Sequence, residues 1–219
     1  MKDPAQLLVA YCNAKNYPIT TTPGHLNILY VEGVNPDFTP NDDAFDGWND
    51  LRILLDHKLD TGLPFIAFSQ VATTEPGSTH TFSMASKKNG GVARLAFRHY
   101  ARKWVMGYHN YSRERNNHPA LVQKQGETIM VHRDIDRNGK RTGDPISPAF
   151  GVNHHGVHAK SAPKKVGLYS AGCPVGLDWA LHIEFIIRCS SDLRYQANKA
   201  FAFSATIIAG DDLLKFEKT

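Results

Sequence analysis

Cys173 and the histidines before it are the residues of this chain best suited to covalent chemistry. The stretch NHHGVHAKSAPKKVGLYSAGCPVG, residues 153–176, places three histidines shortly before a cysteine that follows Ser-Ala-Gly. A nucleophilic cysteine needs a base for its proton and backbone N–H groups directed at the oxyanion that forms during attack. Gly172 allows a close backbone approach because it has no side chain. The amides of Ala171, Gly172 and Cys173 are therefore candidates for an oxyanion hole.

His155 is the candidate base, and it precedes Cys173 by 18 positions. That separation allows a strand ending at the histidine, a loop, and a return strand over residues 166–170. This path would bring the imidazole back beside the sulfur. Lys164 and Lys165, if they lie near, would favour the thiolate.

The spacing of His155-Gly156, thirteen further residues and then Ser170-x-Gly172-Cys173 resembles the catalytic motif of the L,D-transpeptidase (YkuD-like) family. The resemblance implies a β-rich catalytic fold that acts on peptidoglycan stem peptides through a thioester. It implies that Cys173 is the nucleophile and that His155 is first general base and then general acid. Ser170 would brace the turn or the histidine.

Four further residues are candidates for substrate binding or for orienting the base. Gly156 and Tyr169 stand next to the motif residues and could line the cleft, although Tyr169 could equally pack in the core. Asn153 and His154 flank the proposed base, and either could orient it; His154 is also a candidate for contacting substrate.

Two departures from the family motif argue against a typical bacterial wall cross-linker, and the missing second histidine together with the missing secretory signal favours hydrolysis. Ala171 stands where the family usually has a second histidine, and Pro-Val-Gly follows the cysteine. The segment is similar to a divergent phage and bacterial lytic branch, a likeness that extends from about Leu26 to Phe185. It implies a wall peptidase, such as a phage endolysin, that stays in the cytoplasm until released.

Two other functions compete with the peptidase. His154, His155 and His158 with Cys173 could hold zinc for a hydrolase, but adjacent residues on a strand point to opposite faces. The chain could also be a non-catalytic wall-binding or virion structural module of the same fold. In the simplest case Cys173 is a buried thiol in a glycine-rich turn.

Composition limits these interpretations. The 219 residues are 42% hydrophobic and 21% charged, with a net charge of +4, as in an ordinary globular protein. Lysine and arginine are scattered, so nothing indicates a nucleic-acid partner. We see no membrane span, no secretory signal and no cofactor motif. Cys12, Cys173 and Cys189 are odd in number and without framework spacing, so we expect free thiols.

The elements that must position the motif form one β-rich α+β domain, residues 1–219, with a helical N-terminal extension over residues 1–20. Asp3-Pro4 predicts the start of a helix that runs to about Lys15, with Cys12 on its apolar face. A second helix is expected after the cysteine over residues 177–201, with His182 and Cys189 on its apolar face. Short apolar runs predict strands over residues 26–33, 51–56, 64–73, 103–109, 120–123, 127–136 and 202–210.

Several other residues are open. Long loops over residues 35–47 and 73–91 could line a groove. Trp48, Trp104, His109 and His118 could do the same, although single aromatic residues and histidines are more often core or surface features. Asp134, Asp136 and Asn138 followed by Gly139 match the start of a calcium loop, but Pro145 replaces the twelfth-position acid. An Asn-Gly turn is the favoured interpretation.

Overall fold

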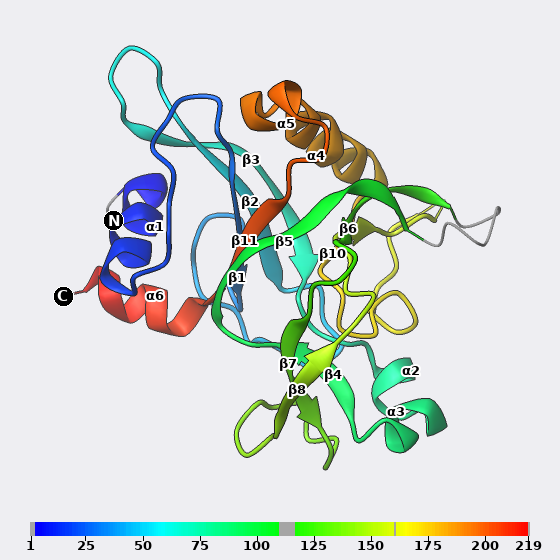
Figure 1. Cartoon of the computed structure of the whole chain (residues 1–219). Helices are drawn as coiled ribbons and strands as arrows, with labels where there is room; N and C mark the ends of the chain where they lie inside the picture. Colours follow the sequence, from blue (N-terminus) through cyan, green and yellow to red (C-terminus); the bar gives the residue numbers. More distant parts are fainter. Residues whose placement is uncertain (1–2, 110–116, 160, 219) are drawn as a thin grey trace.

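The structure is a computed structural model and describes residues 3–109, 117–159 and 161–218. The described residues form a sheet-rich α+β fold, as predicted (Figure 1). Its main sheet has the strand order β6-β5-β11-β1-β2-β3-β10-β9. These strands are β1 (Asn27–Glu32), β2 (Asp50–His57), β3 (Pro64–Thr73), β5 (Arg98–His109), β6 (His118–Gln123), β9 (His155–Gly156), β10 (Val175–Gly176) and β11 (Phe203–Ala209).

The two end strands of this sheet approach each other, so the sheet is a nearly closed barrel. Leu121 in β6 and His154 beside β9 form an antiparallel bridge, with N···O distances of 3.1 and 2.8 Å. The next residue, His155, pairs with Val175 in β10. The line along which the barrel closes therefore passes through the proposed base.

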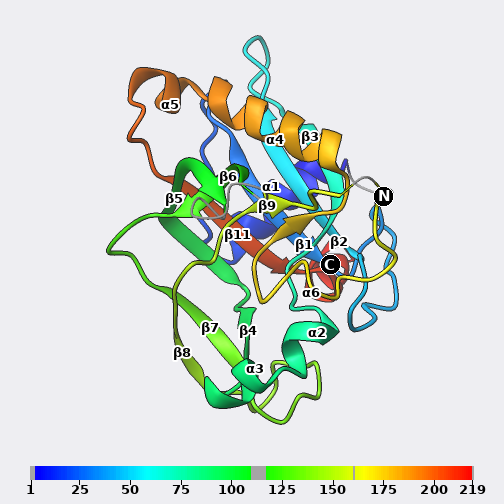
Figure 2. The same cartoon turned by 90° about the vertical axis from the view of Figure 1, so that its right-hand side faces the viewer.

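A second, three-stranded sheet lies below the barrel in the view of Figure 1. It consists of β4 (Val92–Leu95), β7 (Ile129–Asp134) and β8 (Ile146–Ala149). The short helices α2 (Ser78–Thr81) and α3 (Met84–Lys88) lie on the same side of the molecule (Figure 2). They occupy the segment 73–91, which we expected to be an irregular loop.

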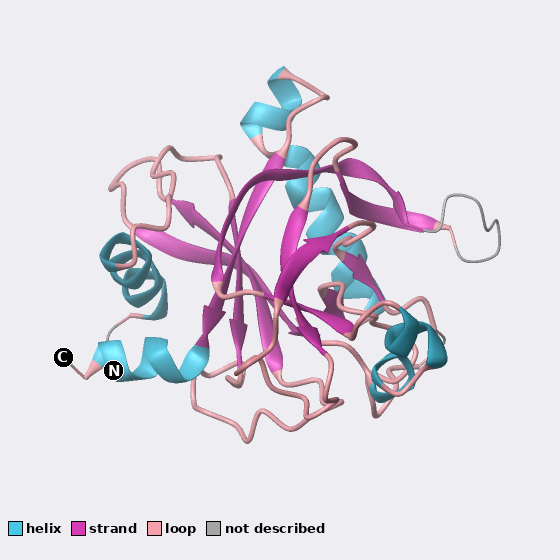
Figure 3. Ribbon diagram, turned by 60° about the horizontal axis from the view of Figure 1, so that its bottom comes forward, coloured by secondary structure: helices cyan, strands magenta, loops and turns pink. Residues whose placement is uncertain are grey.

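The other helices pack around the barrel, and both ends of the chain lie beside it (Figure 3). Asp3 caps α1 (Pro4–Ala14) through hydrogen bonds from the next turn, as its sequence predicts. The helix α6 (Gly210–Glu217) contacts α1. The helices α4 (Trp179–Ser191) and α5 (Leu193–Ala197) follow β10. Within the described residues, no helix is long and apolar enough to cross a membrane.

The strand β1 separates two apolar cores because its side chains alternate between faces. Tyr30 faces the core that contains Trp104, Phe185 and Cys189. Leu29 faces the core under α1 and α6, which contains Cys12. Cys12 and Cys189 are fully buried free thiols, which confirms their predicted packing role.

Two further predicted elements are wrong in extent or type. Residues 166–170 form a turn closed by a hydrogen bond from Tyr169 N to Val166 O, with Gly167 at a φ of +49°, and not a strand. The predicted helix over residues 177–201 is two helices. Asp192 separates them because its side chain caps α5 by accepting from the Arg194 amide.

Candidate active site at the closure of the barrel

The backbone of His155 is hydrogen-bonded to the segment that carries Cys173. His155 in β9 pairs in parallel with Val175 in β10. Its amide donates to the carbonyl oxygen of Pro174 at 3.1 Å. The fold thus places the segment that carries His155 beside the segment that carries Cys173, and it does so through a two-residue strand pair that the sequence pattern did not reveal.

The thiol of Cys173 is half-buried and contacts the segment just before His155. Its Sγ accepts a hydrogen bond from the Asn153 amide at 3.4 Å, and the thiol donates to the carbonyl of Gly151 at 3.6 Å. Burial raises the pKa of Cys173 to about 11, and the Asn153 amide only partly offsets this. The resting thiol is therefore protonated. No hydrogen bond joins it to His155 among the described residues, and none joins it to the exposed Lys164 or Lys165.

The His155 imidazole is neutral and has one basic nitrogen available. Its Nδ1 lies 3.3 Å from the carbonyl oxygen of Gly156. A carbonyl only accepts, so Nδ1 carries the proton and Nε2 has the free lone pair. Burial, then the neighbouring His109, hold the pKa of His155 well below its usual value. A neutral imidazole with a free nitrogen is the form that a general base requires.

Asn153 and His109 link the thiol to the imidazole. The Asn153 side-chain amide donates to His109 Nδ1 at 3.1 Å, while its backbone amide contacts the sulfur. The His109 ring stacks on His155 with centroids 4.0 Å apart and planes 11° apart. Of the two residues expected to orient the base, Asn153 thus acts through His109, a contact that the sequence did not indicate.

Ser170 braces the turn that carries the cysteine. Its hydroxyl donates to the Cys173 carbonyl at 2.9 Å and accepts from the Gly172 amide at 3.1 Å. The Gly172 amide is therefore engaged. The amides of Ala171 and Cys173 have no acceptor among the described residues, and they are the ones left to bind an oxyanion.

The close approach of Gly172 to β4 explains why a glycine precedes the cysteine. Gly172 has a φ of +113°, and a Cβ there would lie 2.4 Å from the Ala93 carbonyl oxygen. On the other side of the turn, the Gly77 amide donates to the Ser170 carbonyl at 2.9 Å. The turn is thus held between two backbone segments.

A buried ion pair joins those two segments. Arg94, next to Ala93 in β4, donates to the carboxylate of Glu75, two residues before Gly77. Arg94 is fully buried and also lies 3.6 Å from the Asp134 carboxylate. These charges lie behind the cysteine turn, so their role is to fix its supports.

Arg52 is the principal residue that the sequence analysis missed. Its guanidinium is fully buried and makes four hydrogen bonds inside the barrel. Nη2 donates to the carbonyls of His155 at 2.9 Å and Pro174 at 3.2 Å. Nε donates to Tyr30 Oη at 2.7 Å, and Nη1 lies 3.1 Å from His182 Nδ1. The sequence feature that could have indicated this role is a charged residue, Arg52, within the mostly apolar strand segment LRILLD.

His182 fills the space that Gly156 leaves open. A Cβ on Gly156 would lie 2.4 Å from His182 Cγ, so only glycine fits beside this ring. Because Nδ1 accepts from Arg52, Nε2 donates to the Pro119 carbonyl at 2.8 Å. Burial and the Arg52 charge lower the pKa of His182 to about 3. Packing against the His182 ring thus explains why a glycine follows His155.

His154 points away from the site. Its ring is fully buried beside Trp104, and its Nδ1 lies 3.0 Å from Tyr30 Oη. It therefore does not line a cavity beside His155, and it cannot share a zinc ion with His155 and His158. In the parts of the chain that the structure describes, the potential ligands that lie within 4.8 Å of one another as a trio are Asp134, Asp136 and Asp144.

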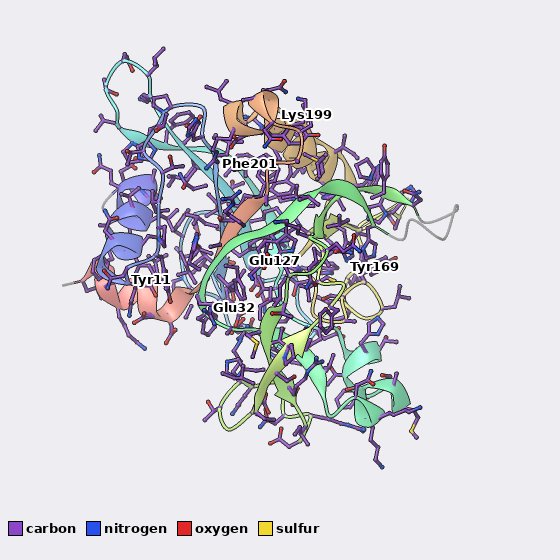
Figure 4. The ribbon with its side chains drawn as sticks, in the orientation of Figure 1. Tyr11, Glu32, Glu127, Tyr169, Lys199 and Phe201 are labelled. Carbon is purple, nitrogen blue, oxygen red and sulfur yellow. The ribbon has the colours of Figure 1, made fainter. Side chains whose placement is uncertain are left out.

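A cavity of about 290 Å³ opens beside His155 and is lined mainly by rings. We call it the imidazole pocket; its lining residues are His109, His118, His155, Gly156, His158, Leu168 and Tyr169. Tyr169 marks this side of the barrel in Figure 4, away from the α1 side marked by Tyr11. The predicted substrate residues Gly156 and Tyr169 thus face one cavity with the proposed base. Trp104 instead belongs to the core.

A second cavity, of about 490 Å³, lies next to the sulfur contacts. Gly151 and Asn153, whose backbone atoms contact Cys173 Sγ, line it. Exposed Tyr108 and Phe150 border this cavity, and exposed Leu168 borders the imidazole pocket. The residues that contact the Cys173 sulfur therefore line one cavity, and the proposed base lines the other.

The calcium-like segment forms a loop between β7 and β8. The Asp134 carboxylate accepts from the amides of Asn138 and Gly139, at 3.0 and 3.1 Å. Gly139 has a φ of +73°. The Asp134 carboxylate thus serves the turn, as the favoured interpretation expects, although the loop is longer than a two-residue hairpin.

Comparisons with known proteins return no relative that could assign this site. No family model matches the chain, and neither a curated protein nor a solved structure matches it. The function must therefore be argued from the residues and their geometry.

Proposed function

We propose that the protein is a cysteine-dependent peptidoglycan peptidase of the L,D-transpeptidase-like type, with Cys173 as nucleophile and His155 as base. The observation that carries the proposal is the hydrogen bond from His155 N to Pro174 O, which fixes the two segments side by side at the seam of the barrel. The motif spacing supports the same pairing. The amides of Ala171 and Cys173 supply oxyanion donors.

In the proposed reaction, Cys173 Sγ attacks a carbonyl carbon of the stem peptide while the thiol proton passes to His155 Nε2. The imidazolium then gives that proton to the departing amine, which leaves a thioester on Cys173. Water, activated by the same imidazole, hydrolyses the thioester and restores the thiol. The raised pKa of the thiol and the lowered pKa of the imidazole keep both groups neutral at rest, so the proton is transferred only as the sulfur attacks.

The attack requires a change of the Cys173 rotamer from its contact with Gly151 O toward His155. Catalytic hydrogen bonds are often formed only once substrate is bound. One cavity is lined by His155 and the other by the residues that contact the sulfur, and an extended peptide that occupied both would bring a carbonyl to Cys173. The exposed apolar rims of the two cavities suit the burial of peptide side chains.

The test is the digestion of purified peptidoglycan, with products identified by mass, using the wild-type protein and the variants Cys173→Ala and Cys173→Ser. We expect peptide products from the wild type alone. The melting temperatures of both variants should be close to that of the wild type. Incubation with a carbapenem, followed by intact-protein mass measurement, should give an adduct that depends on Cys173. Wall degradation by folded Cys173→Ala would show that the nucleophile is another residue.

The base is tested in the same assay with His155→Gln, and His25→Gln serves as the control because His25 lies in the loop before β1. We expect a loss of about 10²- to 10⁴-fold in rate for the first variant and no change for the second. A loss of only a few-fold would make His155 structural. Binding to sacculi that persists in Cys173→Ala, without products from the wild type, would instead identify the non-catalytic wall-binding module.

A further inference from the structure

The imidazole pocket contains more histidines than the proposed reaction uses. His109 at the end of β5, His118 at the start of β6 and His158 after β9 surround the same cavity as His155. The His118 ring centroid lies 5.2 Å from that of His109, 5.7 Å from that of His155 and 5.8 Å from that of His158. Elements far apart in the chain thus bring four imidazoles to one cavity.

The lining of the pocket offers hydrogen-bond donors, and among the described residues it includes no carboxylate. Because His109 Nδ1 accepts from Asn153, the proton of a neutral His109 ring lies on Nε2, which is then a donor. Trp179 packs its ring 4.5 Å from that of His158 and closes the α4 side. Such a lining would stabilise an anion, since His109 Nε2 can donate a hydrogen bond to it and each imidazole can gain a proton.

Geometry argues against a metal ion as the occupant. The rings of His109 and His155 stack in parallel, so their nitrogens lie side by side and do not converge on one point. Among the described residues, no trio of these histidines has its ligand nitrogens within 4.8 Å of one another. Tetrahedral zinc needs nitrogens at about 2.0–2.1 Å from the ion.

We propose that His109, His118 and His158 form a subsite that binds a carboxylate of the substrate peptide, next to the bond that Cys173 attacks, and that binding takes up a proton. This inference rests on the proposed function, because it concerns the substrate of the same site. It names an acidic peptide as the substrate class and assigns three histidines a role in specificity.

The charges around these rings favour proton uptake only when an anion arrives. In the free protein, burial and then His118 lower the pKa of His109 to about 4, so the ring is neutral near pH 7. Among the described residues, the other titratable or charged groups near the pocket are Tyr169 and His182, Arg52 behind His182, Asp178, which caps α4, and Cys173 on the segment paired with His155. A bound carboxylate places a negative charge beside the rings, which raises their pKa.

The probe is a stem peptide released from purified peptidoglycan, compared with the same peptide after its carboxyl groups have been amidated. Binding to the Cys173→Ala protein is measured by calorimetry near pH 6 and near pH 8, in pairs of buffers that differ in ionisation enthalpy. We expect binding of the acidic peptide to be about tenfold tighter at the lower pH, with net proton uptake. The amidated peptide should bind more weakly and without proton uptake.

Substitutions in the same background locate the effect. His118→Gln and His158→Gln, the latter at an exposed position, should each weaken binding of the acidic peptide by about tenfold and reduce proton uptake. His25→Gln should change neither the affinity nor the proton uptake. A peptide amidated only at its C-terminus distinguishes a terminal from a side-chain carboxylate. The melting temperature of each variant checks its folding.

Three results would overturn the inference, and they are distinguishable. Equal binding of acidic and amidated peptides would leave the peptidase in place and remove the carboxylate subsite. Tight binding of Zn²⁺ alone, lost in His118→Gln and competitive with the peptide, would make the pocket a metal site. If neither the acidic nor the amidated peptide binds the folded protein, the result would count against the proposed function as well.

Discussion

Arg52 Nη2 donates a hydrogen bond to the carbonyl oxygen of His155 at 2.9 Å, and the same nitrogen lies 3.2 Å from the carbonyl oxygen of Pro174. One buried cation therefore holds both strands of the candidate site from inside the barrel. Its other hydrogen-bond partners are Tyr30 and His182, both neutral side chains. The arginine donates hydrogen bonds to backbone carbonyls next to the proposed base and nucleophile. Its planar guanidinium can donate to several acceptors at once.

Arg52→Lys should therefore misplace the site. A lysine ammonium is a single point with three donors and cannot reach the same set of acceptors. We expect a fall in kcat of about 10²-fold from misalignment. Each hydrogen bond to the guanidinium that lysine cannot replace should cost about 1.5–3 kcal/mol of the free energy of unfolding, although the Pro174 carbonyl keeps the His155 amide as a donor. Arg102→Lys, an exposed substitution, is the control in peptide release and denaturant unfolding; full activity of folded Arg52→Lys would contradict this role.

Gly172→Ala should be far more harmful than a glycine substitution elsewhere at positive φ. Gly90 has a φ of +72°, and a Cβ there would have nothing within 4 Å, so Gly90→Ala measures the backbone cost alone, about 1–2 kcal/mol. At Gly172 the Cβ also meets the Ala93 carbonyl, which should add about 1–3 kcal/mol. Urea unfolding of the two variants gives the difference. Equal destabilisation would show that the cysteine turn is not held against β4.

Ser170→Ala should weaken both the turn and the reaction. It removes the hydroxyl that joins the Gly172 amide to the Cys173 carbonyl, leaving two polar groups unpaired at a buried position. We expect a loss of about 1–3 kcal/mol in the free energy of unfolding for each group. The rate should fall with it, because the oxyanion donors lie in this turn. The free energy of unfolding and the rate of peptide release are measured for the same variant, with Ser191→Ala at the exposed end of α4 as control. If neither quantity changes in Ser170→Ala, Ser170 does not brace the turn.

The thiol of Cys173 should react slowly near neutral pH. Its pKa is raised to about 11 by burial, so only the small thiolate fraction attacks iodoacetamide. The alkylation rate, followed by mass at Cys173, should rise by about tenfold per pH unit from about pH 7 to pH 10. A plateau near pH 6–7 would instead reveal a preformed thiolate–imidazolium pair. Cys173→Ser sets the background from the two buried cysteines.

Calcium should not stabilise the protein. The Asp134 carboxylate already serves the Asn138 and Gly139 amides and lies beside Arg94, whose positive charge opposes a cation. Millimolar calcium and a chelator should give melting temperatures within about 2 °C of each other, since a ligand stabilises only by binding the folded state. A clear rise with calcium that disappears in Asp136→Asn would establish a site in this loop.

The sequence by itself was sufficient for local structure. Asp3-Pro4 determines the start of α1 because an aspartate cap and a proline at the first turn satisfy local requirements. Short apolar runs identify β1, β2 and β3 because a sheet selects residues that suit its buried faces. The spacing of His155 and Cys173 likewise nominated a pair, which remains a proposal for catalysis.

Only the tertiary structure decided which side chains share the site. The strands β9 and β10 have two residues each, too few for any periodic signal, and they exist because barrel closure pairs them with distant strands. That closure turns His154 into the core and His155 toward His109 and His118, and it places Arg52 beneath both strands. These contacts join residues far apart in the chain, and such long-range packing leaves no pattern in a local window of sequence.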